Sequence, residues 1–182
     1  EGDVPNKMGN SYSDFLASWT ALGALMGCLL RRARTGEGQW IDLAMYQTGT
    51  TVIGAGLLDF EYNDRRTQRI GNRHPFLSPH GVYRCQGADQ WVAIAARDDA
   101  DWQSICQAIG APELISDPRF ADPMDRRRHQ EDLDAIILAW TAEKTSYEVM
   151  NALQAAGFPA GAVLTAKQAL VDPQYLERGF FE

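Results

Sequence analysis

Hydrophobic and polar positions in the first third of the chain predict two apolar helices with a strand between them. Residues 13–34 place apolar side chains on one stripe at helical spacing: Phe15, Trp19, Leu22, Met26 and Leu29. Residues 39–45 alternate between apolar and polar positions, which predicts a strand, and residues 46–58 predict the second helix. Further leucines widen the stripe of the first helix, so we expect most of that helix to be buried.

One apolar run inside the first helix, residues 16–30, could be mistaken for a membrane span. It is shorter than the roughly 20 apolar residues that a bilayer needs, and Gly23 and Gly27 interrupt it. A buried core helix explains this run better, and we expect no membrane partner.

The pattern changes at residues 59–69, which are polar and charged and predict a linker or an exposed loop. Residues 80–85 and 90–95 then flank Gln86-Gly87-Ala88-Asp89, which predicts a β-hairpin. Further helices are predicted at residues 101–109, at residues 125–140, after capping boxes at Thr145 and Thr165, and after Asp172-Pro173. The chain therefore reads as an α/β piece followed by a small α+β unit.

Composition narrows the choice of protein class. A chain of 182 residues with 45% hydrophobic content is long enough for one ordinary domain with a core. The net charge of −7 argues against a nucleic-acid partner, because a phosphate-binding surface needs a basic excess. Cys28, Cys85 and Cys106 are far apart and lack metal-ligand spacing, so we expect free thiols, a cytoplasmic location and no bound metal.

Asp14 stands where a polar segment, residues 9–14, passes into the first helix. A carboxylate in the first turn of a helix is favoured in its ionised form by the helix dipole and by unpaired backbone N–H groups. An ionised carboxylate can attack an electrophilic carbon. The residue alone leaves two interpretations open: a nucleophile, or an acid that only stabilises the start of the helix.

The second candidate is the loop Gly71-Asn72-Arg73-His74-Pro75. A glycine, an amide, a cation and an imidazole before a proline provide several hydrogen-bond donors, which could cover an anion or polarise a carbonyl group. An ordinary surface turn is the alternative.

Other polar features are expected to be structural. We expect this for His80 and His129, and the mixed charges of residues 126–132 predict a solvated helix face. The sequence contains no Walker loop, no Gly-x-Gly-x-x-Gly, no Gly-x-Ser-x-Gly and no zinc pattern. The residues by themselves thus indicate a soluble α/β piece with one candidate aspartate.

Several short motifs occur in a fixed order along nearly the whole chain. They are Gly9-Asn10-Ser11-Tyr12-Ser13-Asp14, Arg34-Thr35-Gly36-Glu37-Gly38-Gln39, Ile41-Asp42-Leu43, Gly71-Asn72-Arg73-His74-Pro75, Gly81-Val82-Tyr83, Asp117-Pro118-Arg119-Phe120, Gly157-Phe158-Pro159-Ala160-Gly161 and Asp172-Pro173-Gln174. In this order and at these spacings they closely resemble the class III coenzyme A transferases, the group of formyl-CoA transferase and the carnitine and bile-acid CoA transferases. Each motif is weak by itself, whereas the ordered set is specific.

The resemblance implies the class III CoA-transferase fold, which is α/β: part of a Rossmann-like large domain plus a small α+β domain, in an interlocked homodimer. Residues 1–45 would belong to the large domain, 46–70 to a linker, 71–160 to the small domain and 161–182 to the start of a return linker. Because the chain begins at Glu1 without a methionine, we expect an internal piece of a longer polypeptide. Most coenzyme A contacts would then lie upstream, and the residues that make them are unknown.

The family's catalytic aspartate falls on Asp14, which implies covalent catalysis. Its carboxylate would attack an acyl-CoA thioester, and an acyl-aspartyl anhydride, an aspartyl-CoA thioester and a second anhydride would follow. The implied substrates are coenzyme A, carried as a thioester, and a small carboxylic acid, with no permanently bound cofactor. Gly71, Asn72, Arg73 and His74 match a mobile segment that would keep water from the anhydride.

Two alternatives compete with CoA transfer. The α-methylacyl-CoA racemases share the fold and keep an aspartate at this position, but use it as a base toward the carbon beside the thioester. The loop at residues 71–75 looks more like that of the transferases, which favours transfer. In the third interpretation the chain alone is an inactive structural piece with the helix at residues 13–34 exposed.

Overall fold

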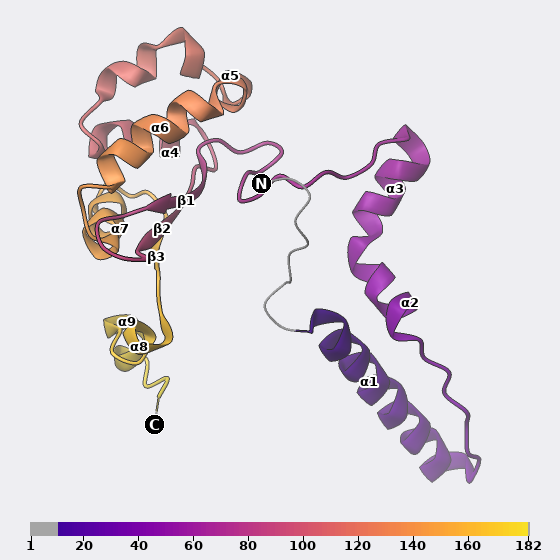
Figure 1. The fold of residues 1–182 in the computed structure, drawn as a ribbon. Helices are drawn as coiled ribbons and strands as arrows, with labels where there is room; N and C mark the ends of the chain where they lie inside the picture. The colour runs from indigo at the N-terminus through magenta and orange to yellow at the C-terminus, as the bar shows by residue number, and fades with distance from the viewer. Residues whose placement is uncertain (1–10, 182) are drawn as a thin grey trace. The chain divides into compact units, whose positions relative to one another are not determined.

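The computed structural model describes residues 11–181 of the chain. The described chain divides into two compact units, one up to Arg69 (unit 1) and one from Ile70 onward (unit 2). Figure 1 shows the elements of both, and each unit is described by itself. Residues 9 and 10, which begin the segment around Asp14, lie outside the described residues.

Unit 1 is built from helices: α1 (Tyr12–Thr35), α2 (Met45–Thr50), the 3₁₀ helix η1 (Thr51–Ile53) and α3 (Gly54–Asn63). α1 ends at Gly36, whose left-handed φ of 75° suits glycine and whose N–H donates to the Arg32 carbonyl. The second predicted helix is present, but η1 interrupts it and α3 continues it to Asn63.

The strand predicted for residues 39–45 is wrong. Residues 37–44 have no regular secondary structure, and α2 begins at Met45. A strand is stable when a neighbouring strand pairs its backbone N–H and C=O groups. The described residues of unit 1 contain no other strand, so the alternating pattern has nothing to pair with.

The expected burial of α1 is also wrong for the described chain. Ala17 is the one buried residue of its 24, while Phe15 is 58% and Trp19 is 70% exposed. The apolar stripe is present, but the described residues of unit 1 leave most of it uncovered. α1 extends beyond the apolar run at residues 16–30 at both ends. By length and composition alone it could cross a membrane, but the core helices of soluble proteins meet the same criteria.

Unit 2 contains a three-stranded antiparallel sheet in the order β1 (His80–Arg84), β2 (Trp91–Ala95), β3 (Ala160–Val163). β1 and β2 confirm the predicted hairpin, and its turn holds Gly87 at φ 106° and Asp89 at φ 53°. The sequence did not predict β3. This strand places Gly161 opposite Ala93 of β2, so β2 is the central strand.

The helices of unit 2 are α4 (Asp99–Ala108), η2 (Pro112–Ser116), η3 (Pro118–Phe120), α5 (Pro123–Arg128), α6 (Gln130–Thr141), α7 (Ser146–Ala155), α8 (Ala166–Ala169) and α9 (Pro173–Glu177). Both capping boxes are confirmed, because the Thr145 and Thr165 side chains each accept from the backbone N–H three residues on. The single helix predicted at residues 125–140 is instead α5 and α6. His129, at φ −102° and ψ 27°, separates them.

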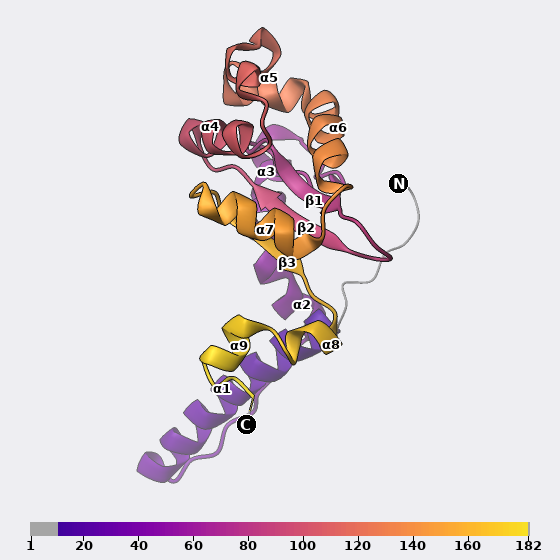
Figure 2. The ribbon, with the colours of Figure 1, turned by 90° about the vertical axis from the view of Figure 1, so that its left-hand side faces the viewer.

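The core of unit 2 lies between one face of the sheet and helices α4, α6 and α7 (Figure 2). Strands and helices both contribute to its fully buried side chains, which include Val92, Ile94, Ile105, Leu133, Ile137, Val149 and Leu153. Successive side chains of a strand point to opposite faces of a sheet. The register therefore places the following residues on the face away from this core: His80, Val82, Ala93, Ala95 and Gly161.

All three cysteines are free thiols, as predicted. Cys85 and Cys106 are buried, and burial raises the pKa of the Cys106 thiol to about 12. A thiol held in its protonated form is a poor nucleophile, so these two side chains act as core residues.

Candidate active site

Asp14 lies in the first turn of α1 with an exposed side chain. Its backbone N–H donates to the Ser11 carbonyl at 3.1 Å, where the helix begins. The N–H groups of a first helical turn have no partner within the helix and carry its positive end. The Asp14 side chain is therefore exposed at the N-terminal end of α1.

The loop of residues 71–79 leads into β1 and is held by its own histidine. Gly71 turns the chain at φ 60°. The Nδ1 atom of His74 accepts hydrogen bonds from the backbone N–H groups of Phe76 and Leu77, both at 3.2 Å. This imidazole nitrogen therefore stabilises the turn.

His80 ties the same loop to the first strand. Its Nδ1 lies 2.7 Å from the Asn72 carbonyl oxygen, and because a carbonyl only accepts, Nδ1 carries the hydrogen. The His74 and His80 rings are 5.2 Å apart. On the other side, Gln130 of α6 donates to the His80 carbonyl at 3.3 Å. The loop is thus connected both to the sheet and to α6.

A pocket of about 750 Å³ lies within unit 2 beside this loop. It is lined by loop residues 71–73, by strand residues 80–82, 93–95 and 160–161, and by Gln154 and Pro159. Among these described lining residues there is one arginine, one histidine and no carboxylate. A mostly apolar cavity with a few hydrogen-bond donors is typical of a small-molecule site.

Arg73 connects the pocket to α6. Its Nη2 atom lies 3.5 Å from Glu131 and 3.8 Å from Asp134. The Tyr83 hydroxyl donates to the other oxygen of Asp134 at 2.7 Å. Burial raises the pKa of Tyr83 and also that of Asp134. At Asp134, the hydrogen bond from Tyr83 and the positive charge of Arg73 partly oppose this rise. Tyr83 therefore remains a donor, and Asp134 is fixed beside the arginine.

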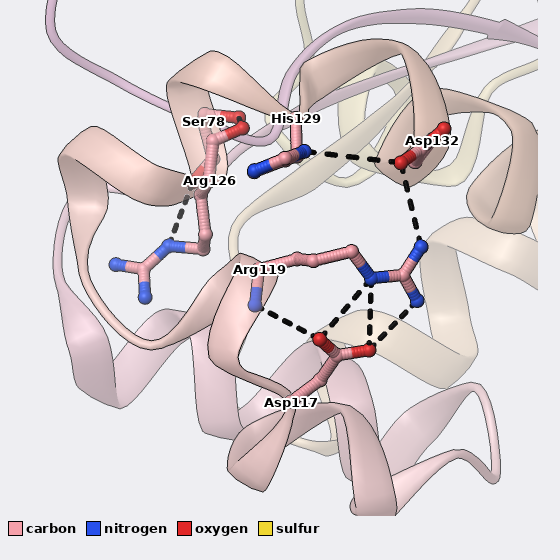
Figure 3. Close-up of polar contacts among 6 residues, drawn as sticks. All are labelled: Ser78, Asp117, Arg119, Arg126, His129 and Asp132. Carbon is pink, nitrogen blue, oxygen red and sulfur yellow. Dashed lines mark hydrogen bonds and ion pairs between the residues drawn. The ribbon is translucent and has the colours of Figure 1, made fainter.

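Arg126 contradicts the solvated face predicted for residues 126–132, because it is only 2% exposed. Its Nε donates to the Ser78 carbonyl at 3.2 Å (Figure 3), and Nη1 donates to the Phe120 carbonyl at 3.1 Å. The guanidinium also pairs with Asp99 and lies over the Trp102 ring at 5.4 Å. Partners from three other segments, the loop before β1, α4 and η3, satisfy this buried charge, which a sequence pattern does not reveal.

The contact between Ser78 and Arg126 is reciprocal. The Ser78 hydroxyl donates to the Arg126 carbonyl at 3.1 Å, while the Arg126 side chain donates to the Ser78 carbonyl. Because Ser78 is near the end of the 71–79 loop, α5 anchors that end of the loop.

The Asp117-Pro118-Arg119-Phe120 motif forms an ion-pair network on η3 (Figure 3). Arg119 donates to both oxygens of Asp117, which lowers the pKa of that carboxyl, and its Nη1 lies 3.4 Å from Asp132. His129 Nδ1 is 3.9 Å from the same Asp132. The motif thus supports the fold of unit 2 at a distance from the pocket lining.

The structure brings together only some of the predicted site residues. Gly71, Asn72 and Arg73 line the pocket, whereas His74 is absent from the described lining. His80, expected to be structural, does line it. The one available signal for His80 was its position at the start of a strand, on the same face as Val82. Asp14 belongs to unit 1 and is described separately.

Comparison with known proteins agrees with this architecture. A solved CAIB/BAIF family protein from Brucella suis matches 97% of this chain and 46% of its own chain, with a TM-score of 0.86 and 27% identity. The family described as CoA-transferase family III matches residues 1–182. The chain therefore belongs to CoA-transferase family III.

Two relatives illustrate the family. The succinyl-CoA–D-citramalate CoA-transferase of Chloroflexus aurantiacus is 35% identical over 175 residues, 96% of this chain and 43% of the relative. The acetyl-CoA:oxalate CoA-transferase of Acetobacter aceti is 30% identical over 170 residues, 93% of this chain and 43% of the relative. The chain thus spans less than half the length of these relatives.

Proposed function

We propose that the full-length polypeptide carrying this chain transfers coenzyme A from an acyl-CoA thioester to a free carboxylic acid. Family membership and the names of the relatives support this reaction. The observation that carries it is the exposed carboxylate of Asp14 at the start of α1. By resemblance, this is the position of the family's catalytic aspartate.

In the first half of the proposed reaction, Asp14 acts as a nucleophile. Its carboxylate attacks the donor thioester carbonyl and forms an acyl-aspartyl anhydride, and the thiolate of coenzyme A leaves. That thiolate then attacks the aspartyl carbonyl, which frees the donor acid and leaves an aspartyl-CoA thioester.

The second half repeats these steps with the acceptor acid. Its carboxylate attacks the aspartyl-CoA thioester and again releases the thiolate, which leaves an anhydride between the acceptor and Asp14. The thiolate attacks the acceptor carbonyl of this anhydride, which yields the new acyl-CoA and regenerates the carboxylate. One difficult exchange is thus divided into steps between groups of similar reactivity.

We propose that Gly71, Asn72, Arg73 and His74, at the start of the 71–79 loop, shield the anhydride from water. His74 stabilises the turn, His80 holds Asn72, and Arg126 anchors Ser78, so the loop has a defined shape. A covered site would favour attack by the thiolate over hydrolysis.

The acids named for the two relatives suggest a substrate class. Of the four acids in these names, citramalate, succinate and oxalate carry two carboxyl groups, and acetate carries one. We therefore propose a small dicarboxylic acid as a substrate of this protein.

The remaining expectations are proposals of the same kind. They are a Rossmann-like large domain, an interlocked homodimer, a cytoplasmic location, and inactivity of the 182-residue chain alone. The exposed stripe of α1 supports the last, because that helix lacks a covering layer within unit 1. Light scattering on the full-length protein and on the 182-residue chain tests the dimer.

Hydroxylamine trapping tests the mechanism directly. The full-length protein is incubated with a panel of acyl-CoA donors and hydroxylamine, and peptides covering residues 9–31 are analysed by mass spectrometry. A hydroxamate on Asp14 is expected, because hydroxylamine intercepts both the anhydride and the aspartyl thioester. An unmodified Asp14, together with deuterium uptake beside the thioester in heavy water, contradicts transfer and indicates a racemase.

A further inference from the structure

We propose that His74 makes the turn at residues 74–77 sensitive to pH. The turn is closed while the imidazole is neutral, and it opens when mild acid protonates the ring. The proposed switch involves residues of unit 2 alone and stands independently of the CoA-transferase function.

The hydrogen bonds of His74 define which of its ring nitrogens carries a hydrogen. Nδ1 accepts from the backbone N–H groups of Phe76 and Leu77, both at 3.2 Å. A ring nitrogen that accepts has a free lone pair, so the neutral imidazole carries its hydrogen on Nε2. Nδ1 is therefore the atom to which an added proton binds.

A proton on Nδ1 removes this acceptor. The new N–H bond uses the lone pair to which Phe76 and Leu77 donate, and both ring nitrogens of an imidazolium ion are donors. Three N–H groups would then converge within the turn, so the His74 side chain or the backbone of residues 74–77 must move. Both hydrogen bonds are lost in either case.

The anchors at the two ends of the turn persist in acid. His80 donates from Nδ1 to the Asn72 carbonyl, and this donor remains when a proton binds to the other ring nitrogen of His80. Ser78 exchanges two hydrogen bonds with Arg126, whose guanidinium stays charged at any pH that the protein survives. The opening is therefore confined to residues 74–77.

The surroundings of His74 give solvent protons access to the ring. His74 is half-buried, and Phe76 beside it is 73% exposed. The charged and titratable groups near the ring are Arg73, which precedes it in the chain, His80 of β1, with a ring 5.2 Å away, and Glu131 and Asp134 of α6, which pair with Arg73. Histidine is the side chain whose charge ordinarily changes between pH 5 and pH 8, so the experiment spans this range.

Hydrogen exchange of the full-length protein at pH 8 and pH 5 tests the switch. Mass spectrometry with fragmentation resolves single amides in residues 71–79 and 91–95, and rates are corrected for the intrinsic pH dependence of exchange. At pH 5 the Phe76 and Leu77 amides are expected to lose about fivefold to thirtyfold of their protection, as for two hydrogen bonds of ordinary strength. The paired amides of β2 are expected to keep theirs, which shows that unit 2 stays folded.

Three variants assign the effect to His74. An asparagine side chain can accept from backbone N–H groups two and three residues on and does not titrate, so His74→Asn should keep the turn closed at both pH values. His74→Ala has no acceptor, and its two amides should exchange rapidly at both. His80→Asn keeps an N–H donor for the Asn72 carbonyl, so it should respond to pH like the wild type.

Four results would overturn the proposal. Equal protection of the wild type at pH 8 and pH 5 would show that acid leaves the turn closed. Full protection of His74→Ala at pH 8 would show that His74 does not hold the turn. A pH-dependent loss in His74→Asn, or its absence in His80→Asn, would assign the titration to another group. A parallel loss in β2 would show unfolding of unit 2 instead of a local switch.

Discussion

Both units contain helices with apolar faces, but they bury these faces to different extents. In unit 2, α7 buries Val149 and Leu153 completely against the sheet and the neighbouring helices. In unit 1, the longer helix α1 buries only Ala17. An amphipathic pattern therefore predicts that a helix forms, but a second layer must be present before its apolar face is buried.

The candidate site residues are also divided between the two units. Asp14 lies on unit 1, whose described residues form no core, and its proposed role as a nucleophile depends on exposure. Arg73 and the pocket lie on the unit with a continuous core, which holds them in defined positions. The difference suggests that substitutions in unit 1 act mainly on activity, and those in unit 2 on stability.

The largest expected effect is that of Asp14→Asn in the full-length protein. The amide cannot form the anhydride, so we expect CoA transfer to fall at least about a thousandfold. The exposed position predicts little change in the free energy of unfolding. Acyl-transfer rates and urea denaturation measure the two quantities. Asp64→Asn is the matched control, and equal activity loss in both variants would exclude a special role for Asp14.

Leucine truncation tests the contrast in burial. Leu153→Ala is expected to lower the free energy of unfolding of unit 2 by about 2–5 kcal/mol, because Leu153 is 0% exposed. Leu30→Ala in α1 is expected to change stability by less than about 0.5 kcal/mol, because Leu30 is 58% exposed. Urea denaturation and hydrogen exchange of the β2 amides measure both in the 182-residue chain. A large effect at Leu30 would show that α1 is covered in solution.

Buried and exposed arginines of α5 provide a third comparison. Arg126→Met leaves the Ser78 and Phe120 carbonyls without their donors, so we expect a loss of about 3 kcal/mol in unfolding free energy. Arg128→Met removes only an exposed pair with Asp125 and should cost less than about 1 kcal/mol. Urea denaturation at neutral pH measures the unfolding free energy of both variants. Equal effects would mean that Arg126 is not buried as described.

The smallest predicted effect concerns acid. Hydrogen bonds from the Arg97 side chain hold the pKa of Asp101 below its usual value. A carboxyl with a depressed pKa in the folded state stabilises the fold above its unfolded pKa, and this contribution is lost as pH falls through the folded pKa. Asp101→Asn should therefore flatten the decline of stability below about pH 4, by less than about 1 kcal/mol. Thermal unfolding from pH 6 to pH 2 measures this, with Glu143→Gln as the control, and a parallel curve would refute it.

Local signals predicted unit 2 well. The hairpin followed from two β-rich segments around a turn, and the helix starts followed from capping boxes at Thr145 and Thr165. These features depend on residues close together in the sequence. β3 was missed because Ala160-Gly161-Ala162-Val163 has little intrinsic strand preference, and pairing with β2 creates it.

The candidate site was only partly predictable for a similar reason. Asp14 and the loop at residues 71–74 carry unusual residue types, so the sequence pointed to them. Arg126 looked like part of a solvated charge run, and its burial depends on partners such as Asp99 and Phe120 in other elements. The pocket is lined by residues of three strands, and no local sequence pattern indicates a surface built from separate strands.

The order of the strands, β1-β2-β3, also bears on the order of folding. Ala93 lies between Val82 of the adjacent hairpin strand and Gly161, which arrives from a distant part of the chain after α7. Local pairings close sooner than distant ones, because a longer loop must be ordered first. We expect the hairpin to form first and the edge strand at residues 160–163 to dock last.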